Sequence, residues 1–254
     1  MAREQTPFVT DHQGNRLPGN PLRDARVRRA LSLAINRDGI VAQVMDGQAS
    51  PSSQFLPQGA MGHDPSLQPD PYDPAAARVL LAEAGYPEGF TVALHGPNDR
   101  YINDAQILQA VAQMWTRACI RTRVEAMPSS TYFTRSARGE FSVSLLGWGT
   151  GTGEADSPLT SVVGTPDPAR GWGGSNRSGF SHAGLDRLVD RALATLDAGE
   201  REGLYREATQ VAISERPILP LHHQVNIWAA RRGLTYEGRS DERTMAMSLR
   251  PASR

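Results

Sequence analysis

The sequence predicts an α/β fold in which a mostly parallel sheet is flanked by helices. Apolar runs typical of strands occur at 90–96, 120–126 and 141–148. Helix-type patterns lie between them, at 103–118 and 129–139. A strand–helix–strand–helix–strand order with short links is typical of parallel strands joined by right-handed crossovers.

Helices are also expected before these strands. Asp24 can cap a helix that runs to about Arg37, because apolar residues recur along it with helical spacing. A short helical piece follows at 39–45. The irregular, proline-rich stretch 46–73 is expected to wrap the surface or line a cleft. The next helix has clear end signals: Asp73 as N-cap, Pro74 as first residue, and Gly85 after the last.

Within the sheet region, residues 90–96 alternate between two faces. Asn103 and Gln106 resemble a capping box at the start of the following helix. Residues 149–182 are rich in Gly, Ser and Pro, and are expected to be irregular. Two amphipathic helices should follow, ending before Pro217, and then an extended apolar run at 218–229. The remaining tail suggests one or two strands.

Composition narrows the class of protein. Arginine supplies all 27 basic residues, and they balance 27 acidic ones, which disfavours a nucleic-acid partner. The single cysteine, Cys119, excludes an internal disulfide or a cysteine-based metal cluster. No window is apolar enough to span a membrane, and the N-terminus has no apolar signal-peptide core. The polar segment 1–19 is expected to be a linker or a cut edge.

A ligand is expected at the carboxyl ends of the strands, where open parallel α/β sheets bind their ligands. The candidates lie in the loops after the first and third strands of the sheet. They are Asn98, Arg100, Tyr101, Trp148, Gly149 and Thr150. Trp148 offers a flat apolar face, and the glycines after it allow a close backbone approach. An equally weighted alternative is that Trp148 closes the end of the core while the glycines merely turn the chain.

No catalytic or metal-binding motif accompanies these loops. The sequence has no nucleophile elbow, no Walker A motif and no H-E-x-x-H. His222 and His223 are adjacent in an extended run, so they point to opposite faces and cannot chelate one metal together. Glu154 and Asp156 are more simply explained as solvated loop carboxylates. We therefore expect no catalytic residue, no metal and no cofactor.

Long segments of the sequence resemble the family 5 extracellular solute-binding proteins, the peptide-binding components of ABC importers. The resemblance runs through NPLRDARVRRALSLAINRDGIV, YDPAAARVLLAEAGYPEGFTVALHGPNDR and EAMPSSTYFTRSARGEFSVSLLGWG. It continues in GFSHAGLDRLVDRALATLDAGEREGLYREATQVAISERPILPLHHQVNIWA. It implies a lobe of the periplasmic-binding-protein type II kind, from the C-terminal half of a two-lobed protein that closes on its ligand by a hinge.

The resemblance also implies a division of the chain. Residues 20–217 would form the ligand-binding lobe, and residues 218–254 would return to complete a first lobe that is missing here. The latter segment should then be partly disordered, pack differently, or expose apolar surface. The implied partners are a small, peptide-like solute, the missing N-terminal lobe and a membrane permease. The full-length protein would be periplasmic or extracellular and membrane-associated.

One position departs from the family. In peptide-binding relatives the loop with the Gly-Trp pair faces the ligand, and an acidic residue soon after the tryptophan takes the peptide's amino terminus. Trp148 matches the tryptophan, but Gly149, Thr150 and Gly151 follow it. Glu154 or Asp156 could substitute only if the loop is rearranged. The ligand class therefore stays open.

Two further functions are compatible with the sequence. A regulator could reuse the same fold as a ligand-sensing domain, without a transporter. Alternatively, the glycine-rich loop 147–153, which follows a strand, could belong to a nucleotide-binding α/β enzyme domain. The solute-binding lobe is the main prediction, since it rests on the longest match.

Overall fold

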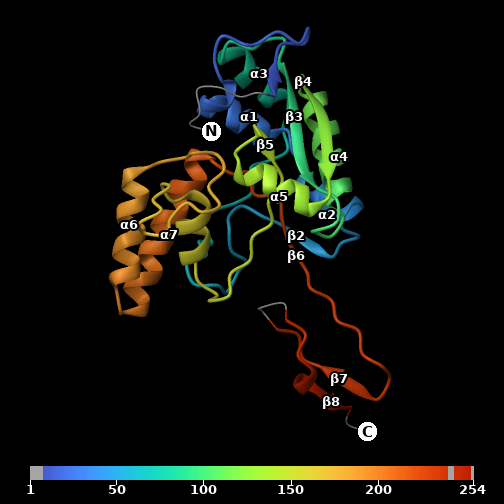
Figure 1. Cartoon of the computed structure of the whole chain (residues 1–254), viewed down its shortest axis with the longest axis vertical. Helices are drawn as coiled ribbons and strands as arrows, with labels where there is room; N and C mark the ends of the chain where they lie inside the picture. The colour runs from blue at the N-terminus through green and yellow to red at the C-terminus, as the bar shows by residue number, and fades with distance from the viewer. Residues whose placement is uncertain (1–7, 240–242, 253–254) are drawn as a thin grey trace.

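The computed structural model describes residues 8–239 and 243–252. Figure 1 shows a body of two parts, from which a C-terminal hairpin reaches away. One part holds the sheet with helices α1 to α5, and the other holds helices α6 and α7. Each part has its own cluster of buried apolar side chains.

The sheet of the first part confirms the predicted parallel arrangement. Strand β3 (Phe90–Pro97) lies at its centre and pairs in parallel with β4 (Ile120–Met127), with Phe90 opposite Ile120. On its other edge β3 pairs in parallel with β5 (Val143–Ser144). The strand predicted at 90–96 is confirmed, and all residues of β3 are buried, so both of its faces are covered.

The third strand is shorter than predicted, because two segments share one edge of β3. Strand β1 (Val9–Thr10) pairs antiparallel with residues 91 and 92, and β5 pairs with residues 94 and 95. Val9 is buried, so β1 packs on the sheet, whereas residues 13–16 are exposed. The expectation that segment 1–19 is a linker or a cut edge stays a prediction; the pairing of β1 within it was not expected, because two residues are too short a signal to recognise in a sequence.

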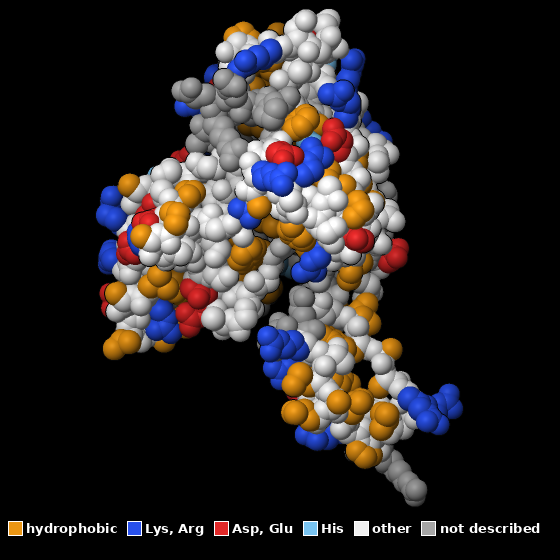
Figure 2. Space-filling view, in the orientation of Figure 1, with side chains coloured by type: hydrophobic (Ala, Val, Ile, Leu, Met, Phe, Trp, Pro, Cys, Tyr) orange, Lys and Arg blue, Asp and Glu red, His pale blue; other side chains and the backbone are white. Residues whose placement is uncertain are grey.

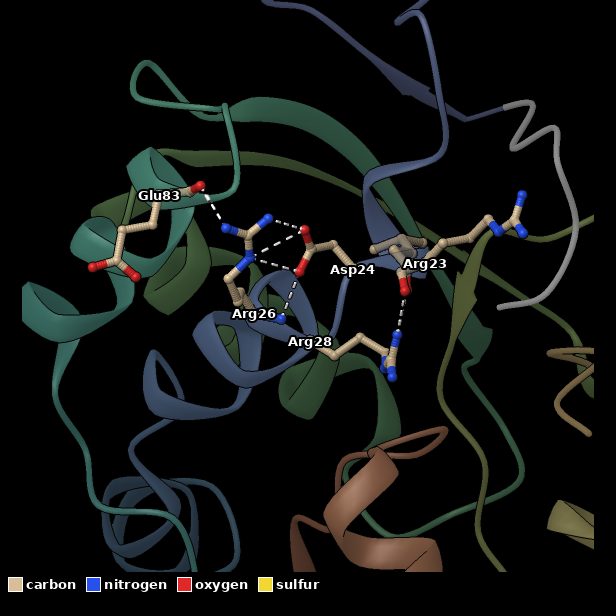
Figure 3. Close-up of polar contacts among 6 residues, drawn as sticks. Arg23, Asp24, Arg26, Arg28 and Glu83 are labelled. Atoms are coloured by element: carbon tan, nitrogen blue, oxygen red, sulfur yellow. Dashed lines mark hydrogen bonds and ion pairs between the residues drawn. The ribbon is translucent and has the colours of Figure 1, made fainter. Parts of the chain in front are cut away.

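Helix α1 (Ala25–Leu33) begins at the predicted cap, after the short 3-10 turn η1 (Pro21–Arg23). The Asp24 carboxylate accepts from the backbone N–H of Arg26 at 2.8 Å and from its guanidinium at 2.6 Å (Figure 3). The same guanidinium donates to the Glu83 carbonyl at 2.7 Å, at the end of α3 (Pro74–Glu83). One arginine therefore joins the start of α1 to the end of α3.

Helix α1 ends four residues before the predicted Arg37. Asn36 accepts from the Gly39 N–H at 2.8 Å and so caps a new helix, α2 (Arg37–Gln43). Because a cap residue needs extended backbone, it interrupts the continuous apolar pattern. Helix α3 has the predicted cap, with the Ala76 N–H donating to Asp73 at 2.8 Å.

The remaining helices of this part are α4 (Asp104–Arg117) and α5 (Ser129–Ala137). The predicted capping role of Asn103 is wrong: its side chain forms no cap hydrogen bond with α4, and its amide N–H donates to the Val44 carbonyl at 2.7 Å. Trp115 on α4 is buried and donates its indole N–H to the Leu31 carbonyl at 2.9 Å. That carbonyl lies in the last turn of α1, where the backbone carbonyl groups have no N–H donor within the helix.

The second part contains α6 (Ala183–Ala194) and α7 (Ala198–Glu215), as predicted, and a π-helix, η2 (Pro158–Val163). The π-helix lies in a region expected to be irregular. Its Leu159 and Val163 are fully buried against the two helices. Tertiary burial therefore orders a segment whose glycine, serine and proline content predicts a loop.

The C-terminal segment leaves the body after one short pairing. Strand β6 (His222–Gln224) pairs antiparallel with β2 (Ala49–Pro51). Farther on, β7 (Leu234–Tyr236) pairs with β8 (Leu249–Pro251), which follows the 3-10 turn η3 (Ala246–Ser248). Apolar side chains are exposed along this segment (Figure 2); they are Val225, Ile227, Leu234, Met247 and Leu249.

Candidate ligand-binding surface

The two loops that follow β3 and β4 meet at the carboxyl end of the sheet. Pro97 lies opposite Met127 at the end of the paired strands. The Asn98 N–H donates to the Met127 carbonyl at 3.0 Å, and the Ser129 N–H donates to Asp99 at 2.7 Å. The strand order alone predicts this juxtaposition, because the ends of parallel strands share one edge.

Tyr101 joins the first of these loops to the glycine-rich loop after β5. Its hydroxyl donates to the Gly147 carbonyl at 3.4 Å. A Cβ on Gly147 would lie 2.5 Å from a ring carbon of Tyr101, so a larger residue there would displace the ring. Residues expected from separate loops therefore form one continuous surface.

Arg100 is exposed beside this ring. Its guanidinium carbon lies 5.2 Å from the centroid of Tyr101. The backbone N–H groups of Arg100 and Tyr101 both donate to the Asp104 carboxylate, at 2.9 and 3.0 Å. The loop is thus held at the start of α4, and the guanidinium side chain stays on the surface.

Trp148 follows directly, and 40% of its surface is exposed. Its indole N–H donates to the Ser157 hydroxyl at 3.2 Å, across the loop. That exposure leaves a flat apolar face open to solvent, in contrast to the reading in which Trp148 closes the core. A Cβ on Gly149 would meet nothing within 4 Å, and the Thr150 hydroxyl donates to the Glu154 carbonyl at 3.1 Å.

The two acidic residues after Trp148 are turned toward the helices of the second part. Glu154 lies 3.3 Å from the guanidinium of Arg201 on α7. Asp156 accepts from the Thr152 hydroxyl at 2.8 Å. Burial, followed by the charges of Asp156 and Glu154, raises the pKa of Tyr205 to about 12. Both carboxylates therefore interact with residues of α7: Glu154 pairs with Arg201, and the charges of both raise the pKa of Tyr205.

A hollow of about 680 Å³ lies where Gly151 approaches the C-terminal hairpin. Its lining includes Thr235, Glu237, Arg239, Ser248 and Arg250. In Figure 2 the hairpin stands apart from the loop side of the body, with basic side chains on the edge that faces it. No motif in the sequence marks these hairpin residues, and only the path of the chain brings them opposite the loop.

Two histidine environments have the geometry of neither a metal site nor a catalytic triad. His95 belongs to β3 and not to the loop after it; it is buried, stacks on Phe141 at 4.3 Å and lies 3.1 Å from Glu125. Burial lowers its pKa, although the charge of Glu125 opposes that shift. Ser52 lies 2.9 Å from His223, but its hydroxyl donates to the Gln54 carbonyl at 2.7 Å.

Across residues 8–239 and 243–252, no three His, Cys, Asp or Glu side chains are grouped as a metal ion would need. The same described residues include no helix that is long and apolar enough to cross a membrane.

The fold is that of a type II periplasmic binding protein. The dipeptide-binding protein of Pseudoalteromonas sp. SM9913, solved with Met-Leu, superposes with a TM-score of 0.78 and is 21% identical. That match covers 98% of this chain and 50% of the solved one.

The sequence comparison defines the family. The model of the bacterial extracellular solute-binding proteins, family 5, matches residues 3–169, which is more than half of the chain. The chain belongs to this family, as the resemblance predicts.

Curated relatives agree with this assignment. The di/tripeptide-binding protein 1 of Pseudomonas aeruginosa is 32% identical over 206 residues, which are 80% of this chain and 38% of the relative. A glutathione-binding protein of Salmonella choleraesuis is 32% identical over 222 residues, 85% of this chain and 42% of the relative. The chain therefore spans about two fifths of the length of these relatives.

Proposed function

We propose that this chain is the C-terminal lobe of the solute-binding component of an ABC importer, and that it has no catalytic activity. It binds a small, peptide-like solute in a cleft between two lobes and delivers it to a membrane permease. Names of the relatives support the solute class, since they include a di/tripeptide-binding and a glutathione-binding protein. The native protein acts in the periplasm or outside the cell, associated with the membrane.

The observation that carries this proposal is the surface at the carboxyl end of the sheet. Trp148 offers an exposed ring, and Tyr101 and Arg100 lie beside it across a hydrogen bond between the two loops. We assign solute contact to this surface, which comprises Asn98, Arg100, Tyr101, Trp148, Gly149 and Thr150. An exposed aromatic ring beside a few polar groups is typical of small-molecule sites.

The proposal divides the chain into a binding lobe, residues 20–217, and a returning segment, residues 218–254. The exposed apolar side chains of Val225, Ile227 and Met247 support this division, because each can be covered by a further lobe. Since a binding protein that closes by a hinge holds its solute with both lobes, the 254-residue chain alone should bind weakly or not at all.

A thermal-shift screen tests the proposal. It uses peptides, sugars and metal chelates against the 254-residue chain and against the longest protein that its gene encodes. A solute at about 100 times its Kd should add about 2.7 kcal/mol of stability to the longer protein. Absence of any shift in both proteins would contradict solute binding.

Variants locate the site in the same screen. Trp148→Ala should abolish or strongly reduce the shift, which is measured from the variant's own melting temperature without solute, because the indole is partly covered and donates to Ser157. The matched control is Val79→Ala, another exposed apolar residue. It lies on α3 beside Arg78, which contacts the end of α4 far from the ligand surface. A shift that survives Trp148→Ala would remove this surface from the proposal.

A further inference from the structure

We propose that Ser157 is a positioning residue of the solute surface: its hydroxyl fixes the orientation of the Trp148 indole, so that the ring is in place before a solute arrives. This inference rests on the proposed function, because it assigns a task within the surface that the function needs. Ser157 lies nine residues after the tryptophan, and it acts on the solute only through that ring.

The Trp148 ring is tethered through its nitrogen. Its indole N–H donates to the Ser157 hydroxyl at 3.2 Å, while 40% of its surface is exposed. The flanking residues, Gly147 and Gly149, have no side chain to pack on it. In the part of the chain that the structure describes, no aromatic ring or guanidinium group stacks on Trp148. Because the indole nitrogen can only donate, the serine oxygen selects the orientation of the ring.

Ser157 can hold the ring because its own backbone is fixed by buried neighbours. It directly precedes the π-helix η2, whose Leu159 is fully buried against α6 and α7. On its other side Ala155 is buried, and the Ala155 N–H donates to the Met61 carbonyl at 3.0 Å. The Leu159 N–H donates to the Ala155 carbonyl at 3.1 Å, so these two buried residues enclose the serine in one turn. The serine is therefore fixed to the core of the second part of the body.

The glycine-rich loop between the tryptophan and the serine is closed by its own hydroxyl groups. Thr150 donates to the Glu154 carbonyl at 3.1 Å, and Thr152 donates to the Asp156 carboxylate at 2.8 Å. A loop that is ordered before the solute arrives loses less conformational entropy on binding. The hydrogen bond to the serine extends that order from the loop to the aromatic ring.

The backbone before the ring is held by the first part of the body. Tyr101 donates to the Gly147 carbonyl at 3.4 Å, and a Cβ on Gly147 would lie 2.5 Å from the tyrosine ring. Trp148 therefore lies between two anchors, since Tyr101 holds the backbone before it and Ser157 holds its indole. Removal of the serine hydroxyl leaves the first anchor intact, so the loop should keep its place while the ring loses its fixed orientation.

The first measurement needs no solute. The longest protein that the gene encodes is labelled with ¹⁵N at its tryptophan indoles, and the Trp148 NMR signal is assigned by its loss in Trp148→Phe. Ser157→Ala should shift this signal and speed exchange of the indole proton with water about fivefold, as expected for loss of one hydrogen bond. Ser157→Thr, which keeps a hydroxyl, should restore both values. The Trp115 signal should not move, because its indole donates to the Leu31 carbonyl.

The second measurement is calorimetric titration of the same proteins with Met-Leu, glutathione and Ala-Ala-Ala. Ser157→Ala should raise the Kd of each probe that binds about fivefold, because the solute must then order the ring. Ser157→Thr should restore the Kd. In Trp148→Phe, which lacks the N–H donor, the further change Ser157→Ala should leave the Kd unaltered, since the two substitutions remove the same interaction.

The matched control is Ser214→Ala, which also removes a hydroxyl group from the second part of the body. The Ser214 hydroxyl donates to the Val211 carbonyl at 2.9 Å, near the end of α7. It is separated along that helix from Arg201, the residue that contacts the Trp148 loop through Glu154. This variant should change neither the indole signal nor the Kd.

The outcomes separate this inference from the proposed function. An unchanged Trp148 signal in Ser157→Ala overturns the proposal, because the hydrogen bond then does not fix the indole. A changed signal with an unchanged Kd overturns the positioning role and leaves solute binding intact. A loss of affinity that persists in the Trp148→Phe background also overturns it, because Ser157 then acts without the indole N–H. If no probe binds the parent protein, a solute from the thermal-shift screen takes their place. If that screen finds none, the proposed function fails and this inference fails with it.

Discussion

Replacement of Gly89 by alanine should destabilise the protein by about 2–5 kcal/mol. Gly89 has φ of +76°, a backbone region where a Cβ costs about 1–2 kcal/mol. That Cβ would lie 1.8 Å from the Cys119 carbonyl oxygen, so the backbone must move. Overpacking of this kind adds about 1–3 kcal/mol. The movement would disturb the first residue pair of β3 and β4, Phe90 and Ile120.

Urea unfolding followed by circular dichroism measures the loss, and each kcal/mol should lower Tm by about 2–4 °C in a protein of this size. The matched control is Gly85→Ala. Gly85 has φ of +91°, and its Cβ would meet nothing within 4 Å. It should therefore lose only the backbone contribution, about 1–2 kcal/mol. Equal losses for the two variants would refute the overlap with Cys119 as a source of destabilisation.

Three further changes have defined outcomes. Burial, with the charges of His222 and His63, lowers the pKa of His223 to about 4. The folded protein then binds fewer protons than the unfolded chain between pH 4 and about 6.5, so stability falls as pH falls through that window. After allowance for solvent screening, His223→Gln should reduce this loss of folding stability by about 2 kcal/mol when urea midpoints at pH 7 and pH 4 are compared. An equal loss of stability in the variant and the parent protein would contradict this. Trp115→Phe removes the indole N–H that donates to the Leu31 carbonyl at 2.9 Å, and should lower the free energy of chemical unfolding by about 1–3 kcal/mol. An unchanged free energy of unfolding would mean that water hydrogen-bonds to this carbonyl in the variant. Gly147→Ala should displace the ring of Tyr101 and weaken solute binding about tenfold, with little change in Tm, because the site is exposed; unchanged affinity would separate Tyr101 from binding.

The predictions that agree with the structure rest on local signals. Helix α3 has its expected ends because Asp73, Pro74 and Gly85 each act on the nearest backbone. Strands β3 and β4 pair in parallel because an intervening helix of that length permits the crossover. The meeting of the loops at Asn98 and Met127 follows from that order, so part of the candidate site was predictable.

Other features depend on residues far apart in the sequence. The Asn36 cap ends α1 early, since one local hydrogen bond interrupts an apolar pattern that continues past it. The edge of β3 that β1 occupies limits β5 to Val143 and Ser144. The π-helix at 158–163 depends on burial against α6 and α7. The local sequence does not predict that burial.

The resemblance of long segments identified the family. Helix caps, strand patterns and chain order predicted the parallel sheet and the loops at its carboxyl end, because these signals act over short distances. Only the tertiary structure decided the charge of the candidate site. Glu154 is engaged because α7 places Arg201 3.3 Å away, and Arg250 lines the hollow because the hairpin returns toward Gly151. Electrostatic partners are fixed by distance in space, and these residues lie some fifty to a hundred positions apart.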